Sequence, residues 1–209
     1  MSQPPPITPQ TAPVQHLSQA DPTLAAVIER LTLDDIPSTG DVFHDLMGCV
    51  LEQQIHYRST KGLYEKWLGK ASIERLTPAL YDDFQEEVLK HIKLSARKRQ
   101  SAEALAAFFG EHTLDWGAMD DDAVRKTLEG LPGIGPWAAD MILLYTLGRP
   151  DVFAATDYHI KRVMADLYDL PEIKGKAGQR ALEALAKPWA PHRSLATRYL
   201  LAWKDAPKW

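Results

Sequence analysis

A helical spacing of apolar residues recurs along almost the whole chain and limits its fold more than any other feature. In DPTLAAVIERL, Asp21 and Pro22 are typical of a helix start, and the apolar residues that follow are Leu24, Val27, Ile28 and Leu31. The same 3.6-residue period runs through DVFHDLMGCVLEQQI, DDDAVRKTLEGL, GPWAADMILLYTLG and HRSLATRYLLAW, among other segments. β-Alternation longer than a few residues does not occur in the sequence. The pattern predicts an all-α fold of roughly ten helices joined by short loops.

The first 18 residues, MSQPPPITPQTAPVQHLS, differ from the rest because they are rich in Pro, Gln and Thr. That composition is typical of a flexible arm, and the stretch lacks the basic and apolar parts of a secretory signal. We expect residues 19–209 to form the folded domain, with a site cleft between two helical lobes. A central lobe of about residues 41–155 would contain most of the helical segments.

The bulk composition excludes several classes of function. With 28 acidic and 24 basic residues the formal net charge is -4, so a nucleic-acid site would have to be a local basic patch. A single cysteine, Cys49, excludes an intramolecular disulfide and a cysteine-ligated zinc or iron–sulfur cluster. His44 lies five residues from Cys49, off the i, i+4 spacing, so we expect no catalytic metal. No apolar run approaches the ~20 residues of a membrane span.

The segment LPGIGPWAA, residues 131–139, predicts a tight turn between two helices, a helix–hairpin–helix at about residues 122–147. Gly133 and Gly135 supply backbone freedom, and Pro136 suits the first turn of the second helix. Amides at Gly133, Gly135 and Trp137 would point at one spot and bind a phosphate without reading base sequence. The alternative is a plain turn whose glycines only permit close packing of the helices.

Downstream, GRPDVFAATDYHIKR places Asp157 at the expected start of another helix, where the helix dipole stabilises a carboxylate. An isolated Asp at such a position is most often just a helix cap, and Thr156 is a second candidate for that cap. The combination of this carboxylate with the preceding hairpin favours a functional site.

The hairpin together with GRPDVF and DYHIKR resembles the helix–hairpin–helix superfamily of DNA glycosylases, and within it the 3-methyladenine DNA glycosylase II (AlkA-type) branch. The resemblance covers about residues 40–205 and includes LMGCVLEQQIHYRSTKGLYEKW, KLSARKRQSAEALA and KPWAPHRSLATRYLLAW. The sequence departs from that family at Lys93, where a glycine is usual, at Ala154, near a common proline, and at Thr156, where a second Asp is frequent. Nothing matches the amino-terminal β-domain of longer members. The resemblance therefore implies a compact, two-lobed, all-α glycosylase fold with a DNA-binding cleft.

The resemblance also implies a catalytic role. Asp157 matches the family's catalytic aspartate, which stabilises the positive charge that develops on the sugar and orients the attacking water. Trp137 stands where bifunctional relatives carry a nucleophilic lysine, and a tryptophan cannot form a Schiff base. We therefore expect a monofunctional enzyme that releases the base and leaves an abasic site.

By the same resemblance, Trp137, Tyr158 and Trp189 line an aromatic base pocket, because an electron-rich ring attracts a positively charged alkylated purine. The alternative for each, and most evenly balanced for Trp189, is a core residue. Gln54, with Gln53 beside it, matches the residue that fills the gap left by the flipped base. The alternative is an exposed helix end.

Local charge agrees with a DNA partner. Between residues 90 and 102 there are five cations and no acidic residue; the cations are Lys90, Lys93, Arg97, Lys98 and Arg99. Lys161 and Arg193 are further candidates for phosphate contacts, although charge runs are most often solvated faces. The resemblance implies no cofactor, but the carbonyls of Glu129, Leu131 and Ile134 match a structural site for Na+ or K+.

The leading hypothesis is thus a monofunctional glycosylase that excises alkylated purines of the 3-methyladenine type in base excision repair. Alternatives are a helix–hairpin–helix glycosylase for mismatched or oxidised bases, and a non-catalytic helix–hairpin–helix DNA-binding module. The expected partner is double-stranded DNA with alkylated bases. We expect a monomer with no membrane association, in the cytoplasm at the nucleoid.

Overall fold

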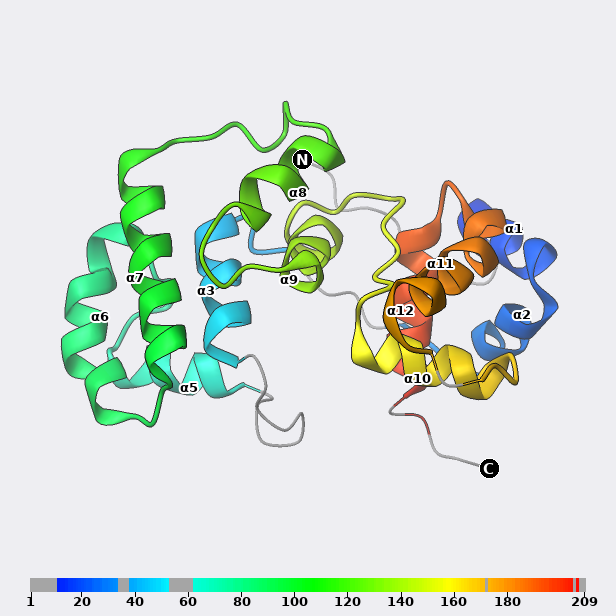
Figure 1. Ribbon diagram of the computed structural model, residues 1–209, viewed down its shortest axis with the longest axis horizontal. Coiled ribbons are helices and arrows are strands. Elements are labelled where there is room, and N and C mark those ends of the chain that lie inside the picture. Colours follow the sequence, from blue (N-terminus) through cyan, green and yellow to red (C-terminus); the bar gives the residue numbers. More distant parts are fainter. Residues whose placement is uncertain (1–10, 34–37, 53–61, 172, 205, 207–209) are drawn as a thin grey trace. The chain divides into compact units, whose positions relative to one another are not determined.

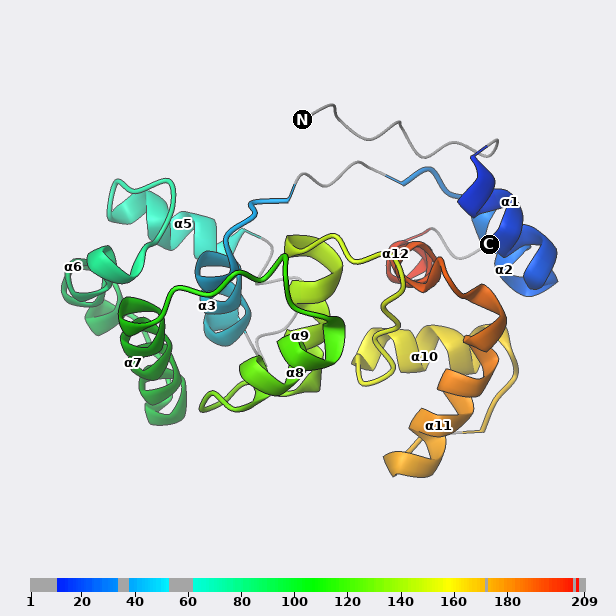
Figure 2. The same cartoon turned by 90° about the horizontal axis from the view of Figure 1, so that it is seen from above.

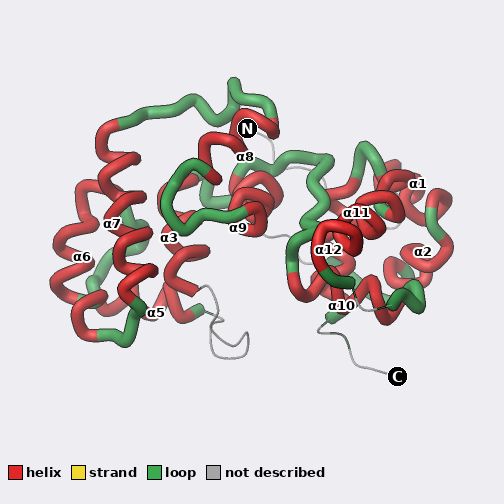
Figure 3. The backbone as a smooth tube through the Cα atoms, in the orientation of Figure 1, coloured by secondary structure: helices red, strands yellow, loops and turns green. Residues whose placement is uncertain are grey.

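The computed structural model describes residues 11–33, 38–52, 62–171, 173–204 and 206 (Figure 1). These residues form helices and connecting loops without a strand (Figure 3), which confirms the all-α prediction. None of the helices in these ranges is long and apolar enough to cross a membrane. The chain divides into two compact units, one of residues 38–147 and one that combines residues 1–37 with 148–209.

The unit of residues 38–147 is built around α3, Val42–Glu52, whose apolar period buries one whole face. The other elements of this unit are α5 Leu63–Lys70, η1 Pro78–Leu80, α6 Tyr81–Glu87, η2 Leu89–His91, α7 Ala96–Glu111, α8 Asp121–Glu129, α9 Pro136–Met141 and the π-helical η3 Ile142–Thr146. Leu46, Met47 and Leu51 have no exposed surface. α3 packs against α5, α7, α9 and η3, so it forms the support beneath the predicted hairpin.

The second unit has its core between helices from both ends of the sequence (Figure 2). Its elements are α1 Ala12–Ala20, α2 Pro22–Ile28, α10 Tyr158–Leu167, α11 Gly175–Leu185, η4 Lys187–Trp189 and α12 Arg193–Trp203. Leu24 of α2, Met164 of α10 and Leu200 of α12 are fully buried in one cluster. α10, which begins after Asp157, is therefore supported by α12 and α2.

The prediction of a flexible arm through residue 18 is wrong for residues 12–18, which lie in α1. Val14 and Leu17 are buried in the core of their unit, and Pro13 falls in the first turn, where a helix tolerates proline. Two buried apolar residues thus outweigh a composition that is typical of disorder. Residues 1–10 lie outside the described part of the chain.

Candidate active site and nucleic-acid interface

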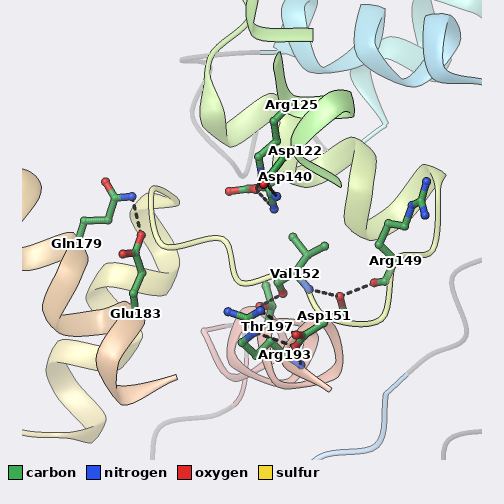
Figure 4. A network of polar contacts seen from close by, with 11 residues as sticks. Asp122, Arg125, Asp140, Arg149, Asp151, Val152, Gln179, Glu183, Arg193 and Thr197 are labelled. Atoms are coloured by element: carbon green, nitrogen blue, oxygen red, sulfur yellow. Dashed lines mark hydrogen bonds and ion pairs between the residues drawn. The ribbon is translucent and has the colours of Figure 1, made fainter. Parts of the chain in front are cut away.

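The predicted helix–hairpin–helix forms from α8, a short turn and α9. The side chain of Asp120 caps α8 by accepting the amide of Ala123 at 2.7 Å. Arg125 of α8 donates to the buried carboxylate of Asp140 on α9 at 3.1 Å (Figure 4). This ion pair joins the two helices on either side of the turn and so fixes the geometry of the turn.

The structure gives a reason for glycine at one of the two glycine positions of the turn but not at the other. Gly133 has a φ of +82°, and a Cβ atom there would lie 2.0 Å from Oγ of Ser101 on α7, so the fold requires glycine. Gly135 has a φ of -118°, which any residue adopts, and a Cβ there would meet nothing within 4 Å. Close packing of helices therefore explains Gly133 but leaves Gly135 unexplained.

The turn also presents backbone donors. Leu131 and Ile134 are buried beneath it, and the amide of Ile134 donates to the carbonyl of Leu131 at 3.2 Å. In the described residues the amides of Gly133 and Gly135 have no hydrogen-bond partner. Trp137, one residue into α9, is half-buried. A side-chain-free position at Gly135 leaves room for a group that approaches these amides.

Asp157 is the N-cap of α10, and its Oδ1 accepts the amides of His159 at 2.7 Å and Ile160 at 2.9 Å. The residue is 6% exposed. The helix-cap interpretation of Asp157 is therefore correct as geometry, and Thr156 is not the cap. A cap does not exclude catalysis, since the same bonds hold the carboxylate in one orientation at the positive end of a helix dipole.

The loop that leads to Asp157 is tied to α12 by an ion pair. Nε and one terminal nitrogen of Arg193 each donate to a different carboxylate oxygen of Asp151, both at 2.7 Å (Figure 4). Hydrogen bonds from Arg193 hold the pKa of Asp151 below its usual range, and the same bonds raise the pKa of Arg193. Two nitrogens of the Arg193 guanidinium are thus engaged with Asp151, while its side chain remains 36% exposed; the contact of Arg193 with phosphate stays a prediction.

Two hydroxyls of α12 complete the attachment of this loop. Ser194 Oγ accepts the amide of Val152 at 2.8 Å and donates to the carbonyl of Arg149, and Thr197 Oγ1 donates to the carbonyl of Val152 at 3.1 Å. Sequence reasoning missed these residues. The available signal was the spacing of residues 193, 194 and 197, which places three polar side chains on one face of the helix.

Beyond Asp157, the first two turns of α10 carry Tyr158 and Arg162. Tyr158 is 64% exposed, and the guanidinium carbon of Arg162 lies 6.0 Å from the centre of its ring. Lys161, on the same helix, is half-buried. The Tyr158 ring thus lies at the surface of its unit with a cation already over it.

The sequence of residues 47–191 matches the model of the HhH-GPD superfamily of base excision DNA repair proteins. The chain belongs to this HhH-GPD superfamily. The match includes both the hairpin and the Asp157 cap, so the two features that the sequence singled out are contained in one family pattern.

Several proteins similar in sequence to this HhH-GPD chain are named as DNA glycosylases or DNA repair enzymes. It is 24% identical to a putative DNA-3-methyladenine glycosylase, YfjP, of Bacillus subtilis, with 90% of this chain and 67% of that protein covered. It is 31% identical to a probable bifunctional transcriptional activator/DNA repair enzyme AlkA of Mycobacterium tuberculosis, covering 90% of this chain but only 38% of that protein. It is 30% identical to a DNA-3-methyladenine glycosylase of Saccharomyces cerevisiae, with 77% of this chain and 60% of that one covered.

Solved structures show the same fold. A DNA-3-methyladenine glycosidase from Bacillus halodurans superposes with a TM-score of 0.74 at 24% identity, covering 95% of this chain and 91% of the other. The Schizosaccharomyces pombe 3-methyladenine DNA glycosylase Mag1, solved in complex with abasic DNA, superposes with a TM-score of 0.78 at 23% identity, covering 95% and 100%. The HhH-GPD fold of this chain is therefore shown by both sequence and structure.

The placement of Trp189 in a base pocket needs correction. The residue has no exposed surface, its indole N–H donates to Oδ2 of Asp21 at 2.9 Å, and Phe153 packs edge-on at 5.7 Å between ring centres. The hydroxyl of Tyr168 donates to the same carboxylate oxygen at 2.6 Å. Of the two interpretations of Trp189, the core residue is the one that the geometry supports.

Gln53 and Gln54, the predicted gap-filling residues, lie outside the described residues, but the helix end that precedes them is well anchored. Nζ of Lys98 donates to the carbonyl of Leu51 at 2.7 Å, and the carboxylate of Glu52 accepts the amide of Tyr64 at 2.9 Å. Burial lowers the pKa of Lys98 and raises that of Glu52. The end of α3 is thus fixed to α7 and α5.

Proposed function

We propose that this chain is a monofunctional DNA glycosylase that hydrolyses the N-glycosidic bond of alkylated purines of the 3-methyladenine type in base excision repair. The observation that carries the proposal is the buried Asp157 carboxylate, which two backbone amides hold at the start of α10. The names of the relatives support it, since DNA-3-methyladenine glycosylases recur among them. In a binding module without catalysis, the same carboxylate would serve only as the N-cap of α10.

Asp157 would act electrostatically. Departure of the base leaves positive charge on the sugar, and a carboxylate nearby stabilises that charge and orients water for attack. Such stabilisation works best when the charged group does not have to reorganise. The two amide bonds to Asp157 and the attachment of its loop to α12 through Arg193 and Ser194 supply that rigidity.

Trp137 would decide the outcome of the reaction. An indole cannot form a Schiff base, so the product is an intact abasic strand rather than a cleaved one. Its ring and that of Tyr158 are the remaining candidates for contact with the base, since the ring face of a tryptophan or tyrosine attracts a cationic purine. Alkylated purines are already good leaving groups, so strong general acid catalysis is not required.

DNA would be held at its backbone by the hairpin. The amides of Gly133 and Gly135 point donors at a phosphate, and the open space at the Cβ position of Gly135 lets that phosphate approach. Lys161 is a further candidate for a phosphate contact, and Gln53 or Gln54 would fill the stack once the target base is flipped. The partner in this proposal is duplex DNA that contains alkylated bases.

The remaining expectations stay proposals. The carbonyls of Glu129, Leu131 and Ile134 would hold Na+ or K+ as a support for the turn, and no other cofactor is proposed. The carbonyl of Leu131 already accepts the amide of Ile134, which leaves one of its lone pairs for an ion. We further propose that the chain acts as a monomer in the cytoplasm at the nucleoid.

Incubation with methylated duplex DNA tests the function. The released bases are separated by chromatography, and the strands are examined before and after alkaline treatment. We expect free 3-methyladenine, together with strands that break only on alkaline treatment. Binding to the duplex without release of any base would leave only a DNA-binding module, and strand cleavage without alkali would contradict the monofunctional mechanism.

A further inference from the structure

The basic segment around the start of α7 has no assigned role in the function proposed above. It contains Lys90, Lys93, Arg97, Lys98 and Arg99 without an acidic residue among them. α7 accordingly has no acidic side chain in its first turn, although the helix dipole favours acidic residues there and disfavours cations. The cations of this segment therefore need an explanation that the helix itself does not give.

Three of the five cations are engaged within the unit. Lys90 forms an ion pair with Glu86, one turn earlier. Lys98 donates to the carbonyl of Leu51, as described above, and Arg99 donates to the carbonyl of Ile92 at 3.0 Å. These side chains hold neighbouring segments together, and their charges are not directed at a partner.

The remaining two, Lys93 and Arg97, are exposed, and in the described residues neither side chain has a hydrogen bond or an ion pair, although the carbonyl of Arg97 accepts from Oγ of Ser101 at 3.0 Å. The bond from Arg99 to Ile92 folds the preceding loop back onto α7. The residue that follows Ile92 is Lys93, so this bond keeps Lys93 close to the first turn of α7, on which Arg97 lies.

One face of α7 connects Arg97 with the hairpin. Residues four apart share a face of a helix, and along this face Leu105 is fully buried, Ser101 is 4% exposed and Arg97 is exposed. Ser101 is the residue against which Gly133 packs. Figures 1 and 2 both show the turn between α8 and α9 beside α7. This face of α7 therefore reaches solvent at Arg97. Along the helix axis, Arg97 lies about one turn, or about 6 Å, from Ser101, which contacts the hairpin.

We propose that Lys93 and Arg97 form a second contact with the DNA backbone, adjacent to the phosphate that the hairpin amides bind. The inference rests on the proposed function, and it assigns the DNA contact to two of the five cations. The charges match a polyanion, and phosphates follow one another at about 3.4 Å of helix axis along a strand. A strand that reaches Gly135 thus has neighbouring phosphates within range of Arg97.

The test is a salt titration of DNA binding with the full chain. The probe is a fluorescent duplex that carries a stable abasic-site analogue, and the variants are Lys93→Ala with Arg97→Ala, and Lys66→Ala with Lys70→Ala. The control pair removes the same charge from exposed positions of α5 in the same unit. Thermal unfolding of both variants shows whether the fold is unchanged, as expected for exposed side chains without partners.

Each phosphate contact contributes about 0.9 to the slope of log affinity against log salt for duplex DNA. We expect the Lys93/Arg97 variant to lose about 1.8 of that slope, so its affinity deficit is about 12-fold larger at 50 mM than at 200 mM salt. The control should keep the wild-type slope. A Lys93/Arg97 variant with the slope of the control refutes the second contact.

The two proposals fail in distinguishable ways. If the wild-type chain releases 3-methyladenine and binds the duplex, but the Lys93/Arg97 variant keeps the wild-type slope, only the second contact is lost. An equal loss of slope in both variants would mean a general charge effect and would also overturn it. If the wild-type chain neither binds duplex DNA nor releases base, the proposed function fails and takes the second contact with it.

Discussion

Replacement of Gly133 by alanine tests the packing of the hairpin on α7. The φ of +82° costs a residue with a Cβ about 1–2 kcal/mol. The new methyl group would lie 2.0 Å from Ser101 Oγ and 2.9 Å from Ser101 Cβ, and overpacking of this kind costs about 1–3 kcal/mol. We therefore expect Gly133→Ala to lower the free energy of unfolding by about 2–5 kcal/mol.

A second substitution separates the two contributions. Ser101→Ala removes the hydroxyl that the new methyl group meets but leaves the Cβ and the backbone strain at Gly133. The double variant should therefore recover about 1–2 kcal/mol relative to the sum of the single variants. Gly135→Ala is the control, because its φ of -118° and empty surroundings permit a side chain. It should be neutral or stabilise by about 0.4–1 kcal/mol.

Urea unfolding followed by circular dichroism gives the free energy of unfolding of each of the four variants relative to the wild-type chain. The fluorescent duplex gives the affinity of each variant for DNA. If Gly133→Ala is as stable as Gly135→Ala, or if its effect adds to that of Ser101→Ala without coupling, the hairpin does not rest on α7 as described. Gly135→Ala should fold normally yet bind DNA more weakly, since its methyl group occupies the approach to the turn amides.

Three further predictions concern side chains whose environment sets their protonation or reactivity. Asp151→Asn should cost about 1 kcal/mol or less at pH 7, because the pair with Arg193 is part-exposed. The pKa of Asp151 is lowered in the folded state. The difference in the free energy of unfolding between the wild-type chain and Asp151→Asn, measured by urea titration, should therefore shrink as the pH falls below about 3.8. Burial lowers the pKa of His44 from 6.5, and its Nδ1 accepts the amide of Leu76. The folded state therefore binds fewer protons than the unfolded state, so the free energy of unfolding should fall as the pH drops below 6.5. His44→Asn, which keeps an acceptor, should abolish that dependence, and an unchanged pH profile would contradict the assignment. Desolvation raises the pKa of the half-buried Cys49 to about 12, so a thiol reagent at pH 8 should label the native chain much more slowly than the denatured chain, and equal labelling rates would contradict the raised pKa.

The features that could be predicted from sequence are the local ones. The helical period buries the residues it selects, such as Leu24 and Leu46, because a single helix face decides their position. The hairpin and the Asp157 cap were predictable because glycine, proline and aspartate act on the backbone within a few residues of themselves.

The features that could not be predicted depend on distant partners. The indole of Trp189 is a core group because Asp21, 168 positions away, accepts its N–H. Arg193 pairs with Asp151, 42 positions away, and a basic residue in a sequence gives no sign of such a partner. α1 was missed because two apolar residues in a proline-rich stretch carry a weak signal until a core is available to bury them.

Base release by Asp157→Asn is the measurement that tests the central claim most directly. Asparagine caps helices about as well as aspartate, so this variant keeps the amide bonds of α10 and removes only the negative charge. We predict that it folds with wild-type stability and binds the abasic-site duplex, but releases 3-methyladenine from methylated DNA at least about 100-fold more slowly. Release at the wild-type rate by a folded Asp157→Asn chain would show that this carboxylate is a helix cap and nothing more.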